Sequence, residues 1–160
     1  MKYRSGIGYD LHRTAEDRPL VLGGVRIPCE FGLAGHSDAD VVLHALCDAL
    51  LGAAGLGDIG ELFPDTDPAY TDADSRRFVE NVLARIQSAG YSVCNLDVIV
   101  HAERPKLTEY KPRIRASLAQ LLALPIDTVG VKATTNEGLD AIGRGEAIAC
   151  WATVLLTRAT

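Results

Sequence analysis

The apolar segment from Asp38 to Ala54 constrains the fold of this chain more than any other part of its sequence. It predicts a helix with Ser37 as N-cap, Asp40 completing an acidic first turn, and glycines from Gly55 onwards ending it. In the middle stands His44, which is hard to bury in VVLHALCDALL without a polar partner. On its own, His44 fits a satisfied core histidine as well as it fits a ligand.

A strand-like stretch near the N-terminus places two potential ligands on one face. In GYDLH, Asp10 and His12 are two positions apart, and alternate residues of a strand point to the same side. Such a pair forms either a salt bridge or two-thirds of a metal site. His44 is the natural third ligand, because Asp, His and His make a zinc site with one open position. Asp48 lies one turn after His44 on the same helical face.

The remaining patterns predict one α+β domain over residues 1–160, with a mixed or antiparallel sheet and helices on one face. The hairpin 19–28 turns at Gly23-Gly24. The helix 74–90 carries an apolar stripe, and the helix 108–124 has its proline near the first turn. The last strand is apolar on both faces, as in a strand buried in a larger assembly. The predicted strands outside the hairpin are 4–12, 91–102, 128–135 and 147–157.

Composition limits the partners. Sixteen basic and twenty-one acidic residues give a net charge of −5, which argues against nucleic acid or an anionic membrane as partner. An anionic substrate would therefore need local positive charge, such as metal ions. No apolar run approaches a membrane span, and the N-terminus lacks the apolar core of a signal peptide. The four cysteines are far apart, which favours buried, reduced thiols in a cytoplasmic protein.

Four further stretches carry polar groups that suit phosphate or metal chemistry, each with an ordinary structural alternative. VKATTNEG, residues 131–138, offers a lysine, two threonines and Glu137, but threonine is common at strand ends. The acidic loop 57–74 is long enough to be functional, or is a solvated loop. In HAERPKL, residues 101–107, Lys106 is either a phosphate contact or a solvated lysine. GRGE, residues 143–146, holds an arginine between glycines, which is a weak anion motif.

Together these stretches resemble the 2-C-methyl-D-erythritol 2,4-cyclodiphosphate synthase family of the non-mevalonate isoprenoid pathway. The resemblance covers most of the chain, in order and at continuous spacing, in the segments GYDLH, GGVRIP, GHSDADVVLHALCDALLGAAGLGDIGELFPDTDP, ADSR, KATTNEGL and GRGEAIAC. It implies a phosphorus-oxygen lyase that uses 4-diphosphocytidyl-2-C-methyl-D-erythritol 2-phosphate. The 2-phosphate attacks the β-phosphorus, CMP leaves, and a cyclic diphosphate remains.

The resemblance also implies roles for individual residues. Asp10, His12 and His44 match the zinc ligands, and Glu137 matches the ligand of a second ion, magnesium or manganese. His36 and Thr135 match residues that hold the transition state. Asp48 also has a matching aspartate, whose role stays open; orienting a histidine is one possibility. The implied substrate-binding residues are Asp10, Leu11, His12, His36 and the phosphate contact Ser37; Asp58, Ile59, Gly60, Phe63, Pro64, Asp65, Thr66 and Asp67 around methylerythritol; Ala102, Glu103, Arg104, Pro105, Lys106, Leu107, Thr108, Ala133 and Thr134 around cytidine and diphosphate; Thr135, Asn136 and Glu137; and Ala141 and Arg144.

Members of this family resemble one another as homotrimers around a sheet-lined centre, with active sites between subunits. Arg144 matches a residue of a central cavity that binds isoprenoid diphosphates in some members. Many members have an aromatic residue where this chain has Ala141, which puts isoprenoid binding there in doubt. Two alternatives are a zinc phosphohydrolase, which would release phosphate, and a non-enzymatic isoprenoid-diphosphate-binding trimer with a closed zinc site.

Overall fold

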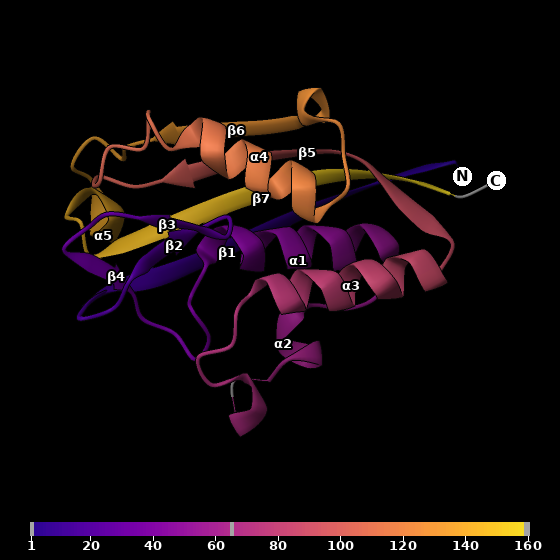
Figure 1. Ribbon diagram of the computed structural model, residues 1–160, viewed down its shortest axis with the longest axis horizontal. Coiled ribbons are helices and arrows are strands. Elements are labelled where there is room, and N and C mark those ends of the chain that lie inside the picture. Colours follow the sequence, from indigo (N-terminus) through magenta and orange to yellow (C-terminus); the bar gives the residue numbers. More distant parts are fainter. Residues whose placement is uncertain (1, 65, 159–160) are drawn as a thin grey trace.

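Two long antiparallel strands, β1 and β7, run side by side from the Tyr3–Thr157 pair to the Arg13–Ala147 pair. They belong to a five-stranded sheet in the order β4-β1-β7-β5-β6, shown in Figure 1 of the computed structural model, which describes residues 2–64 and 66–158. The strands are β1 (Tyr3–Glu16), β2 (Leu20–Leu22), β3 (Val25–Ile27), β4 (Phe31–Leu33), β5 (Tyr91–His101), β6 (Val129–Thr134) and β7 (Ala147–Arg158). The helices are α1 (Val41–Ala54), α2 (Ile59–Leu62), α3 (Arg76–Ser88), α4 (Lys111–Leu121) and α5 (Asp140–Gly143), with 3-10 turns Pro68–Tyr70 and Ile126–Thr128.

The sheet is mixed, as the sequence predicts. The pair β5–β6 is parallel, whereas the pairs β1–β7, β5–β7 and β1–β4 are antiparallel. The predicted hairpin forms a separate two-stranded sheet, β2–β3. The strand β4 was not predicted, because a segment of three residues is too short to show a periodic pattern.

The helix α1 packs against β1 with almost no space between the two backbones. A Cβ atom built on Gly8 would lie 1.9 Å from the carbonyl oxygen of Ala45, and one on Gly6 would lie 2.0 Å from that of Ala49. Glycine on the strand and alanine on the helix therefore permit this contact. Asp10 and His12 lie on the same face of β1 as these glycines, so they point toward α1 as well.

The helix α1 begins later than the sequence predicts. Ala39 has a left-handed backbone with φ of 58°, which breaks the helical path, and Asp40 is the N-cap instead of Ser37. One carboxylate oxygen of Asp40 accepts hydrogen bonds from the backbone amides of Val42 and Leu43, at 3.1 Å each. The predicted end is confirmed, because Gly55 adopts the left-handed C-cap conformation.

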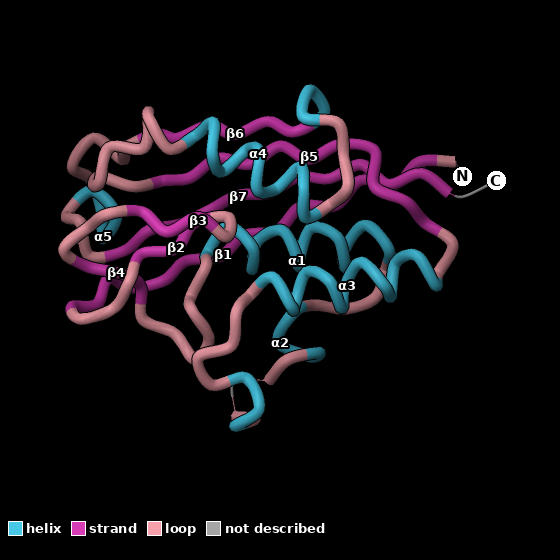
Figure 2. Tube along the Cα trace, in the orientation of Figure 1, coloured by secondary structure: helices cyan, strands magenta, loops and turns pink. Residues whose placement is uncertain are grey.

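The other long helices are confirmed, and they lie on the same face of the sheet as α1 (Figure 1). In α3 the predicted stripe of Phe78, Val82 and Ile86 is buried, and in α4 the proline lies in the first turn. Two predicted loops contain one-turn helices, α2 and α5. Figure 2 shows that the connection from α1 to α3, including α2, stands away from the sheet.

The opposite face of the sheet carries large apolar side chains that are exposed in the single chain. Ile7 is 62% exposed, Leu11 45%, Tyr9 42% and Trp151 41%. The rings of Tyr9 and Trp151 contact each other, with centroids 4.5 Å apart. A contiguous apolar patch on a sheet face is typical of an interaction surface.

The cysteines are free thiols, as the sequence predicts. Cys47 and Cys150 are buried, and burial raises the pKa of both. Cys29 and Cys94 are partly exposed, so the expectation of burial is wrong for these two. Within residues 2–64 and 66–158, no helix has both the length and the apolar character needed to cross a membrane.

The contact between β1 and α1 predicts opposite effects for two glycine-to-alanine substitutions. Gly8→Ala places a methyl group against the Ala45 carbonyl and is expected to destabilise the fold by about 3 kcal/mol. Gly52→Ala is the control: its Cβ would have only one neighbour, the Ile7 oxygen at 3.9 Å, inside a helix, and it should stabilise by about 0.5–1 kcal/mol. Thermal unfolding measures both. Equal midpoints for the two variants would contradict the packing argument.

Candidate metal centre

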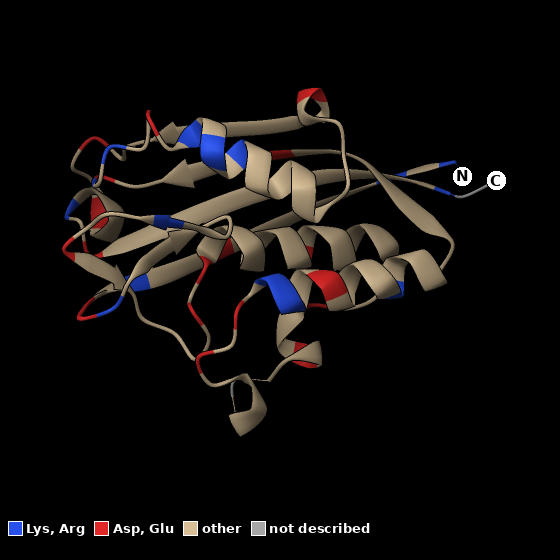
Figure 3. Cartoon of the chain, in the orientation of Figure 1, with Lys and Arg blue, Asp and Glu red and all other residues tan. Residues whose placement is uncertain are grey.

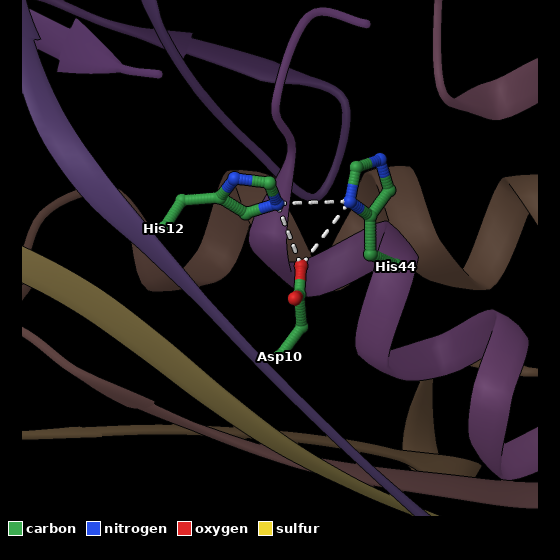
Figure 4. A group of neighbouring side chains, drawn as sticks. All are labelled: Asp10, His12 and His44. Atoms are coloured by element: carbon green, nitrogen blue, oxygen red, sulfur yellow. Dashed lines mark hydrogen bonds and ion pairs between the residues drawn. The ribbon is translucent and has the colours of Figure 1, made fainter. Parts of the chain in front are cut away.

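Three side chains from two elements converge on one point (Figure 4). Asp10 and His12 project from β1, and His44 projects from the second turn of α1. The Oδ2 atom of Asp10 lies 2.8 Å from His12 Nε2 and 3.1 Å from His44 Nδ1, and the two ring nitrogens are 3.0 Å apart. The structure thus brings together the three residues that the sequence analysis selected as metal ligands.

The second nitrogen of each imidazole is already engaged, which fixes the protonation of both rings. His12 Nδ1 lies 2.7 Å from the carbonyl oxygen of Ala34, an acceptor, so this nitrogen carries the proton. His44 Nε2 donates to the hydroxyl of Ser75 at 2.9 Å, because that hydroxyl donates its own hydrogen to Asp38. The remaining lone pairs of both rings face the carboxylate oxygen of Asp10. Such an arrangement needs a cation at its centre, either a proton or a metal ion.

The pKa values of Asp10 and His12 reflect this need for a cation. Burial opposes the charge of Asp10, but hydrogen bonds and charges from His12 and His44 outweigh it and lower the pKa of the carboxyl. Burial likewise disfavours the charged form of His12, yet Asp10 raises the pKa of this imidazole above 6.5. Two imidazoles and one carboxylate suit a divalent ion of the zinc type and leave a coordination position for another ligand.

The three ligands open into a cavity of about 570 Å³. Of the predicted site residues, it also contains His36 and Ser37 at the rim of the ligands, and Ile59, Gly60, Phe63 and Pro64 from the region of α2. The imidazole of His36 contacts Thr71 Oγ1 at 3.3 Å. The backbone carbonyl oxygen of His36 accepts a hydrogen bond from the backbone amide of Asp72. The cavity therefore joins the metal ligands to part of the acidic loop.

Other residues of the acidic loop cap the two short helices that border this cavity. Asp58 is the N-cap of α2 and accepts from the amide of Glu61, and Asp67 caps the 3-10 turn that follows Thr66. Asp48 lies in the cavity, and its carboxylate accepts a 2.8 Å hydrogen bond from the amide of Ile59. Asp48 thus anchors α2, and burial raises its pKa. Asp65 lies outside the described residues.

A second cavity of about 400 Å³ collects most of the residues predicted to bind cytidine and diphosphate. Lys106 and Lys111 both line it, and Figure 3 shows that basic residues are concentrated in the first half of α4. These cations provide local positive charge in an acidic chain. The other lining residues are Ala102, Glu103, Pro105, Leu107, Thr108, Ala133, Thr134 and Thr135.

The turn after β6 is braced by a polar network. The side chain of Asn136 accepts from His101 Nδ1 at 3.0 Å and donates to Asp140 at 2.9 Å. The backbone amide of Asn136 donates to the carboxylate of Glu103 at 3.3 Å. The adjacent Glu137 has a left-handed backbone with φ of 53°, and its amide donates to Thr135 Oγ1 at 3.3 Å. The network ties this turn to the loop that follows β5.

Nine of the predicted site residues that the structure describes line neither cavity: Leu11, Asp58, Thr66, Asp67, Arg104, Asn136, Glu137, Ala141 and Arg144. Leu11 points to the exposed face of the sheet, opposite Asp10 and His12. The guanidinium of Arg104 stacks over the ring of Phe31, 4.9 Å from its centroid. Arg144 forms a two-bond ion pair with Glu146, at 2.9 and 3.0 Å. Ala141 belongs to α5, which packs on the start of β7.

Several residues of the two cavities escaped the sequence analysis. Tyr70 and Phe78 form the aromatic wall of the larger cavity with Phe63, whose ring stacks on Phe78 at 4.7 Å. The helical stripe indicated that Phe78 is buried, but gave no sign that it borders a cavity. Lys111 carried no signal beyond its proximity to Lys106. Ser75 lines neither cavity but contacts His44 Nε2, and its place at the start of a predicted helix gave no sign of this contact.

Fold and site place this chain among α+β proteins whose candidate metal centre lies between a long strand and the helix packed on it. The profile of the YgbB family matches residues 3–157, and the chain belongs to that family. It is 54% identical, over 93% of its length and 95% of the relative's, to a protein of Salinibacter ruber (strain DSM 13855 / M31) named 2-C-methyl-D-erythritol 2,4-cyclodiphosphate synthase.

Solved structures agree with this membership. One of 2C-methyl-D-erythritol-2,4-cyclodiphosphate synthase in a CDP-bound form has a TM-score of 0.88 and 41% identity, covering 96% of this chain and 99% of its own. The bifunctional IspDF from Campylobacter jejuni has a TM-score of 0.94 and 43% identity over 98% of this chain. This chain spans 42% of that longer protein.

The geometry of the ligand group predicts the titration of His12 in chelator-treated protein. Its imidazole should titrate above 6.5, and Asp10→Asn should bring the value down by removing the carboxylate charge. Proton linkage sets the sign: the raised pKa of His12 stabilises the fold below pH 6.5, and the lowered pKa of Asp10 does so above pH 3.8. An NMR titration of the His12 ring measures this. The same midpoint in both proteins would refute the coupling.

Proposed function

We propose that this chain is a 2-C-methyl-D-erythritol 2,4-cyclodiphosphate synthase, a phosphorus-oxygen lyase of the non-mevalonate isoprenoid pathway. The observation that carries the proposal is the convergence of Asp10, His12 and His44 at the mouth of a 570 Å³ cavity, in a chain 54% identical to a protein of that name. The substrate is 4-diphosphocytidyl-2-C-methyl-D-erythritol 2-phosphate, and the products are the 2,4-cyclodiphosphate and CMP.

The reaction is an intramolecular phosphoryl transfer. An oxygen of the 2-phosphate forms a bond with the β-phosphorus, the bond from that phosphorus to the bridging oxygen breaks, and CMP leaves with the electron pair. Because nucleophile and electrophile belong to one molecule, holding the folded conformer supplies several kcal/mol of a limit of roughly 7–11. The remaining reduction of the activation barrier comes from neutralising the charge that develops as CMP departs.

The residues of this chain divide that work. Asp10, His12 and His44 hold a zinc ion, which supplies positive charge when bound. Glu137 would hold a second ion, magnesium or manganese, which would supply further positive charge to the diphosphate. His36 borders the metal ligands and Thr135 borders the lysine-lined cavity, so each donates to phosphate oxygens. The larger cavity takes methylerythritol and the smaller takes cytidine.

We infer further that the active protein is a homotrimer with sites shared between subunits. Two observations support this. The exposed apolar face around Ile7, Tyr9, Leu11 and Trp151 needs a cover, and a sheet-lined trimer centre provides one. In one chain, the metal ligands and Lys106 also line different cavities, so the pocket of one subunit is completed by its neighbour.

We propose that residues 1–160 form one cyclodiphosphate synthase domain that works in the cytoplasm, with no nucleic acid or membrane partner. Four free thiols, two of them buried, suit a reducing compartment. A role for Arg144 in holding an isoprenoid diphosphate is set aside, because this side chain is engaged with Glu146 and Ala141 offers no aromatic surface.

The activity is tested by incubating the zinc-loaded protein with the diphosphocytidyl substrate and magnesium, and identifying products by mass spectrometry. CMP and the cyclic diphosphate in equal amounts are expected. His44→Ala should lose both zinc and turnover, by at least about 100-fold, since it removes a ligand. Release of inorganic phosphate would indicate a zinc phosphohydrolase, and no conversion would indicate a binding protein.

The same assay separates the two ions. Glu137→Gln nearly keeps the shape of the side chain but removes its charge, so turnover should need more magnesium while zinc content stays unchanged. An unaltered magnesium requirement would eliminate Glu137 as a ligand without affecting the zinc assignment.

The shared site predicts complementation between two inactive variants. Co-expression of His44→Ala with Lys106→Ala should give mixed trimers in which roughly one site in three is intact. Because random mixing also gives unmixed trimers, the whole preparation should have roughly a quarter of wild-type activity. Each variant alone is the control. Lack of recovery in trimers shown to be mixed, or a monomer by light scattering, would rule out sharing.

A further inference from the structure

Ser75 occupies a helix N-cap position but does not cap the helix. It immediately precedes α3, where a serine side chain would ordinarily accept from the amides of the first turn, yet it makes no such bond. Asp74 accepts from the amide of Arg76 instead, at 2.9 Å. Ser75 is completely buried, so its hydroxyl must have partners within the protein.

Those partners form a chain that ends on a metal ligand. The Oγ atom of Ser75 lies 2.9 Å from His44 Nε2 and hydrogen-bonds to Oδ1 of Asp38. A carboxylate only accepts, so the hydroxyl donates to Asp38 and its lone pair receives the His44 proton. The relay therefore runs from the imidazole through Ser75 to a carboxylate, and it directs the lone pair of His44 Nδ1 toward Asp10 and His12.

Asp38 is held in place for this contact. Its second carboxylate oxygen accepts from the amide of Ser75 at 3.2 Å, and its own amide donates to the carbonyl of Ala73 at 3.0 Å. The amide of Asp40 also donates to its first oxygen at 3.2 Å. Asp38 thus clamps the segment before α1 onto the segment before α3.

The two histidines of the centre differ in this respect. The outer nitrogen of His12 donates to a neutral backbone carbonyl, that of Ala34. The outer nitrogen of His44 reaches a negative charge through one hydroxyl, with Ser37 Oγ as a further neighbour at 3.1 Å. A carboxylate behind an imidazole fixes its tautomer and orientation and strengthens it as a donor.

We propose that Ser75 and Asp38 are positioning residues of the metal centre, which set the affinity of the site through His44 without touching the ion. This inference rests on the metal site of the proposed function. Removing such a partner typically weakens metal binding by about 10- to 100-fold. Because both residues act on His44 through one hydroxyl, their effects should not add.

The test measures the zinc affinity of each chelator-stripped protein by competition with a chromogenic chelator. Ser75→Ala and Asp38→Asn are each expected to bind zinc about 10- to 100-fold more weakly, and the double variant no more weakly than Ser75→Ala alone. The control is Ser117→Ala in α4, which loses one part-buried hydrogen bond, that of Ser117 Oγ to the carbonyl of Gly23 at 2.7 Å. Its zinc affinity should equal that of the wild type.

The outcomes separate this inference from the proposed activity. Wild-type affinity in Ser75→Ala, losses that add in the double variant, or an equal loss in Ser117→Ala would each overturn the relay. Weakened zinc binding in both variants supports it even if the product assay shows no cyclic diphosphate, because the affinity measurement needs no turnover. Absence of zinc binding by the wild-type protein would overturn the relay together with the zinc site.

Discussion

Backbone-to-backbone packing of α1 on β1 underlies the rest of this structure. Gly6 and Gly8 leave room for the carbonyls of Ala49 and Ala45, so the helix rests directly on the strand. His44 immediately precedes Ala45, and Asp10 follows Gly8 on the same face of β1. The spacing that packs the core therefore also sets the distance between the metal ligands. A larger residue at either glycine would move a ligand as well as a helix.

Asp40 fixes the start of α1 and hence the rotation at which His44 leaves it. One carboxylate oxygen accepts from the first-turn amides and from Gly23, and the other accepts from Gly24, so the hairpin turn and the helix share one anchor. Burial raises the pKa of Asp40 to about 6, although these amides favour its charge. The carboxylate is thus mostly ionised at neutral pH and complements the positive end of the helix.

The metal centre must hold ligand atoms close together although they repel one another. Three ligand atoms that repel one another in the absence of a cation are held about 3 Å apart, and the surrounding structure must balance that repulsion. It does so with a hydrogen bond behind each ring, which His12 donates to the carbonyl of Ala34 and His44 donates to the hydroxyl of Ser75. Among the described residues, no buried side-chain nitrogen or oxygen lacks a partner. The site is therefore preorganised by polar contacts inside an apolar core.

The sequence by itself determined the class of each long element and the faces that they present. Periodicity of two put Asp10 and His12 together, and the helical pattern isolated His44 in an apolar segment, because both signals depend only on local geometry. The start of α1, the strand β4, the cavity wall of Tyr70 and Phe78, and the orientation of Ser75 were decided by the tertiary structure. Each depends on which distant segments meet: Ser75 turns away from its own helix because His44 and Asp38 lie within reach only after α1 and α3 have packed together.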